Sequence, residues 1–333
     1  MKLGKVSHTV YQRSVNNQLY KEDNAILIRP SQAERCYGIT AGDEDIISCD
    51  VSLYGNEKDL CVFAMAQALN HIGTTGAVAE GVSITILLPE FAFESRLKAM
   101  MKEAHDAAKK WKISIFQADA QSIPCTTTTI VHVTAVGRVE HGKCLHSMKT
   151  QPDQDIVLIN HIGTDGALRA KRENEEKLKE HFSPSFLAQI ETMYEEICSL
   201  REMETATAIG VSAMHQIVDG GIMAALWNIA EESGIGLSVD LRKMAIRQET
   251  IEVCEYFHLN PYQITSTGAV LVVTDKGDEL ADTLNRQEMS AVVIGRTQKG
   301  NEKIILNEGE KRYLDRPQPD ELSRIYMPKT QTE

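Results

Sequence analysis

The sequence predicts an α/β fold built from two domains of similar size. A length of 333 residues suggests about two domains. Short apolar or alternating segments recur between segments with helical spacing in both halves. From Val211 to Leu226, a strand-like run breaks at a pair of glycines and a helix begins directly afterwards. We therefore expect domains over residues 1–150 and 151–330, each with helices packed against a sheet.

In the first half, the periodicity predicts a sheet covered by helices on one face. Residues 82–88 alternate between apolar and polar and end at Pro89, which is typical of a half-buried strand. Apolar residues at helical spacing from Leu97 to Trp111 predict a helix over residues 92–111. The other elements expected here are a helix over 56–69 that ends near Gly73 and strands over 113–116 and 127–136.

A composition shift near residues 140–155 marks the expected boundary, and the same alternation of strands and helices follows it. Gly163–Gly166 has the residue types of a turn, and the charged segment 167–181 is expected to be a surface helix. Ser183 and Pro184 form a favourable helix start. The remaining predicted elements are strands over 155–160, 236–240, 268–274 and 291–295 and helices over 248–257 and 278–286.

The charge distribution excludes nucleic acid as an expected partner. Residues 1–150 contain 16 basic and 16 acidic residues, so the whole net charge of −12 comes from residues 151–333. Neither half has the basic stripe that nucleic-acid binding requires. An anionic ligand in such a protein needs metal ions or backbone amides as local counter-charges.

We also expect a cytoplasmic protein without a membrane anchor. No apolar run reaches the about 18 residues of a membrane helix, and residues 1–30 contain no apolar run typical of a signal peptide. The 7 cysteines are scattered singly, which fits free thiols in a reducing compartment.

The glycine pair Gly220–Gly221 is a candidate for binding phosphate. Two adjacent glycines let the backbone approach a ligand, and a new helix presents unpaired N–H groups to it. A structural alternative is that Asp219 caps the helix and takes the place of a phosphate. Gln216 stands where an acidic ligand for phosphate-bound magnesium would be expected.

Several short motifs resemble those of one enzyme superfamily. Residues 213–222, Ala-Met-His-Gln-Ile-Val-Asp-Gly-Gly-Ile, are similar to A-M-R-D-P-T-R-G-G-L of the hydrogenase maturation factor HypE. Glu22–Ala25, Ser48–Asp50, Leu69–His71 and Gln117–Ala120 look like the motifs G-D-D-A-A, T-T-D, V-N-D and G-G-D-T. On these motifs the chain resembles the AIR synthase-related (PurM-like) superfamily, with HypE-like proteins as the nearest members.

The resemblance implies a fold, a cofactor and a set of binding residues. It implies two α/β domains, with the N-terminal sheet pairing with its copy to form the β-barrel of a homodimer. It implies ATP, held through Mg²⁺ by motif aspartates, which is the clamp that phosphoryl transfer requires. The motif match gives Asp23, Asp50, Asp119 and His71 as metal ligands and Asn70, Gly220 and Gly221 as nucleotide-binding residues.

The sequence also departs from the family motifs. His71 and Gln216 replace two aspartates, Asp219 replaces an arginine, and Gln117 replaces a glycine. His71 either accepts a transition metal through its imidazole or lies, hydrogen-bonded, in a site that has lost its metal. HypE carries its substrate on a C-terminal cysteine, whereas this sequence ends at Glu333, so HypE-type chemistry is not expected.

Two hypotheses follow from these observations. The first is an ATP-dependent enzyme that activates a small metabolite through a weakened or altered nucleotide–magnesium site. The second is a catalytically silent paralogue that retains the fold for a binding or regulatory role.

Overall fold

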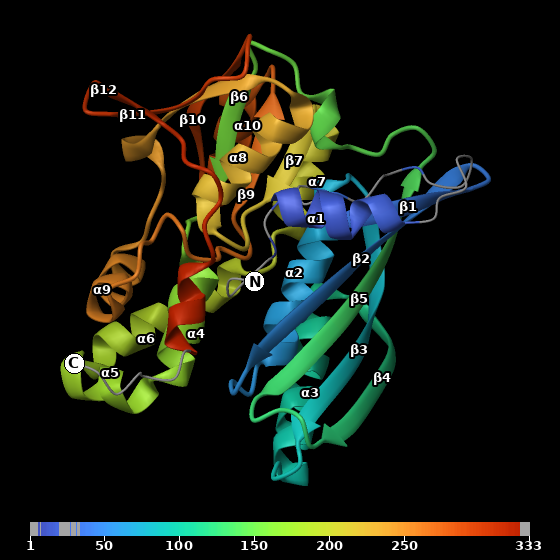
Figure 1. The fold of residues 1–333 in the computed structure, drawn as a ribbon, viewed down its shortest axis with the longest axis vertical. Helices are drawn as coiled ribbons and strands as arrows, with labels where there is room; N and C mark the ends of the chain where they lie inside the picture. The colour runs from blue at the N-terminus through green and yellow to red at the C-terminus, as the bar shows by residue number, and fades with distance from the viewer. Residues whose placement is uncertain (1–5, 7, 20–26, 28–30, 32–33, 327–333) are drawn as a thin grey trace.

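The chain folds around two separate β-sheets (Figure 1). The α/β class expected from the sequence is confirmed. The first sheet lies within residues 36–140 and the second within 155–313, while the domain bounds 1–150 and 151–330 remain a prediction. The computed structural model describes residues 6, 8–19, 27, 31 and 34–326.

The first sheet has the strand order β1-β2-β5-β3-β4. Its neighbouring strands are antiparallel except for β3 and β4, which are parallel. Side chains alternate along β2 and β5, so one face is buried under helices and the other is partly exposed. The strands are β1 (Cys36–Ala41), β2 (Glu44–Gly55), β3 (Val78–Pro89), β4 (Ser114–Ile123) and β5 (Thr129–Glu140). The helices of this part are α1 (His8–Ser14), α2 (Leu60–Thr74) and α3 (Glu94–Trp111).

The second sheet has the strand order β12-β11-β8-β10-β6-β9-β7 and is covered on both faces. Helix α8 packs on one face, and α7 and α10 pack on the other. Its strands are β6 (Asp155–Ile159), β7 (Ala213–Gln216), β8 (Gly236–Asp240), β9 (Val270–Thr274), β10 (Ala291–Gln298), β11 (Lys303–Asn307) and β12 (Glu310–Tyr313). The helices are α4 (Thr164–Glu173), α5 (Glu175–His181), α6 (Pro184–Thr192), α7 (Leu200–Ile209), α8 (Gly221–Ser233), α9 (Gln248–Phe257) and α10 (Gly277–Arg286). Within the described residues, no helix combines the length and apolar character that crossing a bilayer requires.

Helix α2 is buried on all sides. One side, which includes Met65 and Leu69, packs against the first sheet. The other side, which includes Val62 and Phe63, packs against helices that follow β6. The sequence predicted a helix over 56–69 that ends near Gly73, and α2 begins at Leu60 and ends at Thr74. Asn70 and His71 are therefore helical residues inside the protein.

The segment 167–181 is helical as predicted, but the expectation of one continuous surface helix is wrong. The segment forms two helices, α4 and α5, that are separated at Asn174, and α4 is buried from Thr164 to Lys171. The predicted turn over 163–166 is also wrong from Thr164 onwards, since α4 begins there. Charge alone suggested a solvated face, but the basic side chains of α4 pair with carboxylates in the segment between β2 and α2 and on α6.

Arg169 of α4 joins the two parts of the chain. Its Nε donates to Glu57 Oε1 at 3.0 Å, and its Nη2 donates to the Tyr54 carbonyl oxygen at 2.8 Å. The Tyr326 hydroxyl donates to the same Glu57 oxygen at 2.6 Å. The side chains of Arg169 and Glu57 are only 6% and 0% exposed. Removing one member of such a buried pair leaves the other charge without compensation.

Replacing Arg169 with methionine should destabilise the protein strongly. The variant Arg169→Met keeps much of the side-chain volume but leaves Glu57 buried without its cation, which costs about 3–5 kcal/mol. Chemical denaturation of parent and variant measures the loss. Lys177→Met, at an exposed position on α5, is the control and should change stability by less than about 0.5 kcal/mol. Equal effects of the two substitutions would contradict a structural role for Arg169.

Candidate functional site

The glycine pair forms a tight turn between β7 and α8. Gly220 and Gly221 have φ values of 81° and 65°, a region that residues with side chains rarely adopt. A Cβ atom on Gly221 would lie 2.4 Å from the carbonyl oxygen of Tyr262. The backbone here therefore requires glycine, and α8 begins directly behind it.

The amide groups of this turn already have acceptors within the chain. Gly220 N–H donates to Asp320 Oδ2 at 2.8 Å, and Gly221 N–H donates to the Val218 carbonyl oxygen at 2.8 Å. The alternative in which Asp219 caps α8 is wrong, because Gly220 is the N-cap and no side-chain cap is formed. Asp219 instead forms an ion pair with Arg35 at 2.9 Å. As it stands, the turn does not fit a phosphate group, and binding of a nucleotide by Gly220 and Gly221 remains a prediction.

Asp320 sits in an environment that disfavours its charge. Burial and the nearby Asp219 raise its pKa to about 7, although the Gly220 and Leu322 amides favour the carboxylate. Leu322 N–H donates to Asp320 Oδ1 at 2.9 Å. A cavity of about 300 Å³ lies beside this contact, with Gly220 and Gln318 in its wall. Sequence reasoning missed Asp320, because it is 100 residues away from the turn that it contacts.

Two uncharged histidines and an unpaired amide lie buried near the turn. Burial, Arg35 and His215 lower the pKa of His71 well below its usual value. Burial and Arg35 lower the pKa of His215 to about 4. Gln216 is 1% exposed, and neither its amide nitrogen nor its amide oxygen has a partner among the described residues. This environment suits neutral groups better than the ions expected at a magnesium site.

The side chain of Asn70 is hydrogen-bonded to two backbone groups in this region. Its side-chain nitrogen donates to the Ile197 carbonyl oxygen at 2.8 Å, and its side-chain oxygen accepts from Ser199 N–H at 2.9 Å. Both polar atoms of the amide are thus used to hold the segment before α7. Its expected contact with a nucleotide remains a prediction.

The predicted metal ligands are not brought together within the described chain. Asp50 projects from the exposed face of the first sheet, where Thr134 donates to it at 2.6 Å. The pairing of β2, β5, β3 and β4 places Asp119 on the same face, three strand spacings across the sheet and two residues along it, about 16 Å away. His71 lies on α2, behind the opposite face. Asp23 lies outside the described residues. Among the residues that are described, no three metal-ligating side chains converge, so the metal site remains a prediction.

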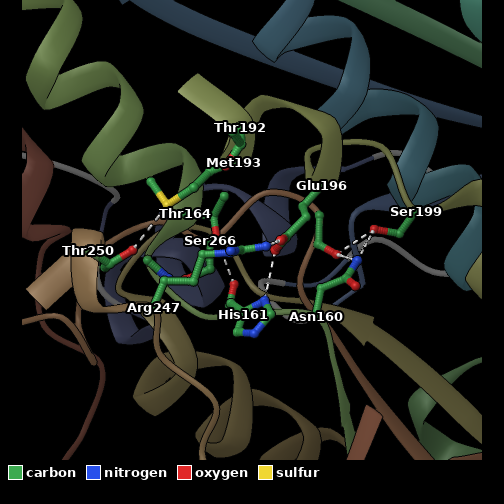
Figure 2. Close-up of polar contacts among 12 residues, drawn as sticks. Asn160, His161, Thr164, Thr192, Met193, Glu196, Ser199, Arg247, Thr250 and Ser266 are labelled. Atoms are coloured by element: carbon green, nitrogen blue, oxygen red, sulfur yellow. Dashed lines mark hydrogen bonds and ion pairs between the residues drawn. The ribbon is translucent and has the colours of Figure 1, made fainter. Parts of the chain in front are cut away.

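A second polar cluster lies where the loops after β6 and before α7 and α9 meet (Figure 2). His161 Nδ1 and Glu196 Oε2 are 2.9 Å apart, and Arg247 pairs with the other oxygen of Glu196. Burial raises the pKa of Glu196, but the hydrogen bonds from His161 and Arg247 outweigh it and lower the pKa overall. Asn160, at φ 60°, donates to the Gly268 carbonyl oxygen at 3.0 Å. These residues are far apart in sequence, so no local pattern pointed to them.

Comparisons with known proteins agree with this architecture. Residues 151–307 match the family model described as AIR synthase related protein, C-terminal domain. A hydrogenase expression/formation protein of Methanocaldococcus jannaschii is 24% identical over 276 residues, which cover 80% of this chain and 79% of that protein. A structure of HypE in complex with ATP has a TM-score of 0.71 at 16% identity and covers 90% of each chain. HypE in a HypE–HypF complex has a TM-score of 0.72 at 16% identity, covering 92% of this chain and 99% of that one.

The two sheets thus have a PurM-like fold, and residues 151–307 are similar to the AIR synthase related C-terminal domain. Within that class of folds the chain is most usefully compared with HypE, which it resembles over most of its length, as its motifs suggested. The likeness to the solved structures establishes the fold, and the dimeric barrel remains a prediction.

Replacing Asn70 should destabilise the protein. The variant Asn70→Ala leaves a buried carbonyl oxygen and a buried N–H group without partners, which costs about 2–4 kcal/mol in total. Chemical denaturation measures the difference from the parent. Asn301→Ala, at an exposed position, is the control and should have little effect. A loss below about 0.5 kcal/mol for Asn70→Ala would rule out the bridging role.

His215 should make the protein sensitive to acid. Its pKa falls from about 6.5 in the unfolded chain to about 4 in the folded protein, so the unfolded state binds the proton first. Stability should therefore decline as the pH is lowered from about 6.5 to about 4, by on the order of 3 kcal/mol from this residue. His215→Gln should flatten that part of the stability curve, whereas the exposed control His105→Gln should not. Identical curves for parent and His215→Gln would refute this assignment.

Proposed function

We propose that this protein binds ATP weakly and uses it to activate a small metabolite, through a nucleotide–magnesium site altered from that of its relatives. The observation that carries the proposal is the fold, which matches a HypE structure solved with ATP over 90% of the chain. Relatives of similar length are named as hydrogenase expression and formation proteins. A role in such a maturation process is therefore the context that the relatives favour.

The residues around the β7–α8 turn support the altered part of the proposal. Gln216 and His71 are neutral where family motifs carry aspartate. Two unit charges 4 Å apart attract each other by about 4 kcal/mol at an effective dielectric constant of about 20, so losing a carboxylate beside a doubly charged magnesium ion costs at least this much attraction. That corresponds to roughly a thousandfold in affinity.

A catalytically silent paralogue is the second candidate. The specific observation in its favour is that Asp320 accepts the hydrogen bond from Gly220 N–H, in the position where a phosphate would be expected. In this case the fold would serve a binding or regulatory role.

We further propose a homodimer formed through the exposed face of the first sheet. That face carries hydroxyl, imidazole and carboxylate groups such as Ser52, His132 and Asp50, and Ser52 is 2.9 Å from His132 Nδ1.

A HypE relative is solved in complex with HypF, so a protein partner is also part of the proposal.

Calorimetry with a non-hydrolysable ATP analogue, with and without Mg²⁺, tests nucleotide binding. We expect weak binding by the parent protein and tighter, magnesium-dependent binding by Gln216→Asp and by the double variant His71→Asp/Gln216→Asp. Gln121→Asp, at an exposed position on β4, is the matched control and should behave like the parent. Absence of heat at millimolar nucleotide for every variant would exclude the nucleotide site. ATP hydrolysis by the parent itself would exclude the silent paralogue.

A further inference from the structure

The C-terminal segment 315–326, here called the strap, passes the start of α8 on its way to the first sheet. It leaves the second sheet after β12 and ends against α4 (Figure 1). At its far end, the hydroxyl of Tyr326 donates to Glu57 and accepts from Arg169 at 3.0 Å. The strap therefore connects the β7–α8 turn with the contact between the two parts of the chain.

The strap meets the turn through one carboxylate. Asp320 Oδ2 accepts from Gly220 N–H at 2.8 Å, and a Cβ atom on Gly220 would lie 2.9 Å from the carbonyl oxygen of Gln318. The start of a helix favours a negative charge because its N–H groups and its dipole point outwards. A carboxylate on that N–H group therefore satisfies the same donor that a phosphate oxygen would use.

One carboxylate, that of Asp320, already occupies this position, while Arg312, Asp315 and Arg316 lie in the wall of the adjoining cavity. Asp219 adds a second carboxylate nearby, and Arg35 is the cation paired with it. A phosphate added beside Asp320 would bring a further negative charge against two carboxylates. Burial raises the pKa of Asp320, and the nearby Asp219 raises it further.

Few buried side chains anchor the strap where it crosses the turn. Residues 315–319 are exposed, and the buried anchors lie on either side of them, at Leu314 and at Leu322. The cavity of about 300 Å³ lies between this exposed stretch and α8, with Met223, Leu241 and Asn260 in its wall. Space for a small molecule is thus already present next to the Asp320–Gly220 contact.

We propose that Asp320 is a built-in competitor for the phosphate position at Gly220, so that a phosphate-bearing ligand binds when the strap releases this contact. The inference rests on the proposed function, because it concerns the control of the same turn. A ligand that needs a minor, released state binds with its affinity reduced by the population of that state.

Removal of the competing carboxylate is the test. Asp320→Ala should bind a non-hydrolysable ATP analogue with Mg²⁺ about 10- to 100-fold more tightly than the parent, the usual range for such coupling. Asp320→Asn should lie between the two, because its amide oxygen still accepts from Gly220 N–H but carries no charge. Asp315→Ala, on the exposed part of the strap, is the control and should match the parent. Circular dichroism checks that each variant is folded, and Asp320→Asn decides the case if Asp320→Ala is not.

Inorganic pyrophosphate separates the two proposals. Equal affinity of parent and Asp320 variants for the ATP analogue would overturn the inference and leave the proposed function standing. Pyrophosphate binding that appears only in the Asp320 variants, with no nucleotide binding by any protein, would support the inference and overturn the nucleotide proposal. Failure of the Asp320 variants to bind either probe would overturn both. Hydrogen exchange should also rise in residues 315–326 of the parent when a probe binds, and unchanged exchange would contradict release of the strap.

Discussion

The burial of helix α2 on all sides is the constraint on which the rest of the structure depends. The helix fills the space between the first sheet and the helices that follow β6. Any polar side chain on it must therefore be hydrogen-bonded or uncharged. Asn70 meets the first condition through Ile197 and Ser199, and His71 meets the second through its lowered pKa. Packing inside the protein therefore accounts for Asn70 and His71, the two positions of α2 that motif matching assigned to ligand binding.

Charge compensation at the β7–α8 turn follows the same logic. The second half of the chain supplies the whole net negative charge of the protein, yet the turn presents N–H groups that favour an anion. Asp320 satisfies one of them from within the chain, and Arg35 from the first part balances Asp219. The turn therefore keeps the backbone geometry of an anion site, but groups of the same chain already provide the hydrogen-bond acceptor and the counter-charge. This combination separates the fold, which is shared with HypE, from the chemistry, which the fold alone does not specify.

Two polar clusters fix the arrangement of the elements, one between the two parts of the chain and one within the second part. Arg169, Glu57 and Tyr326 form a buried cluster that joins α4, the end of β2 and the strap. The loops around His161, Glu196 and Arg247 form a second cluster, close to the segment that Asn70 holds. Both clusters depend on side chains that approach from different elements. A displacement of the strap would therefore also change the contacts at α4 and at the end of β2.

The sequence by itself determined the fold class, most strands and helices, and the glycine turn before α8. These features follow from local rules: alternation marks strands, helical spacing marks α3, and residues other than glycine rarely adopt the backbone of Gly220 and Gly221. The tertiary structure alone decided that α4 is buried, because an Arg169 side chain looks solvated until Glu57 is placed beside it. It likewise decided that Asp320 accepts the hydrogen bond from the turn and that Asp50 and Asp119 stand about 16 Å apart on one face. Partners distant in sequence leave no periodic signal, since their pairing depends on how the whole chain packs.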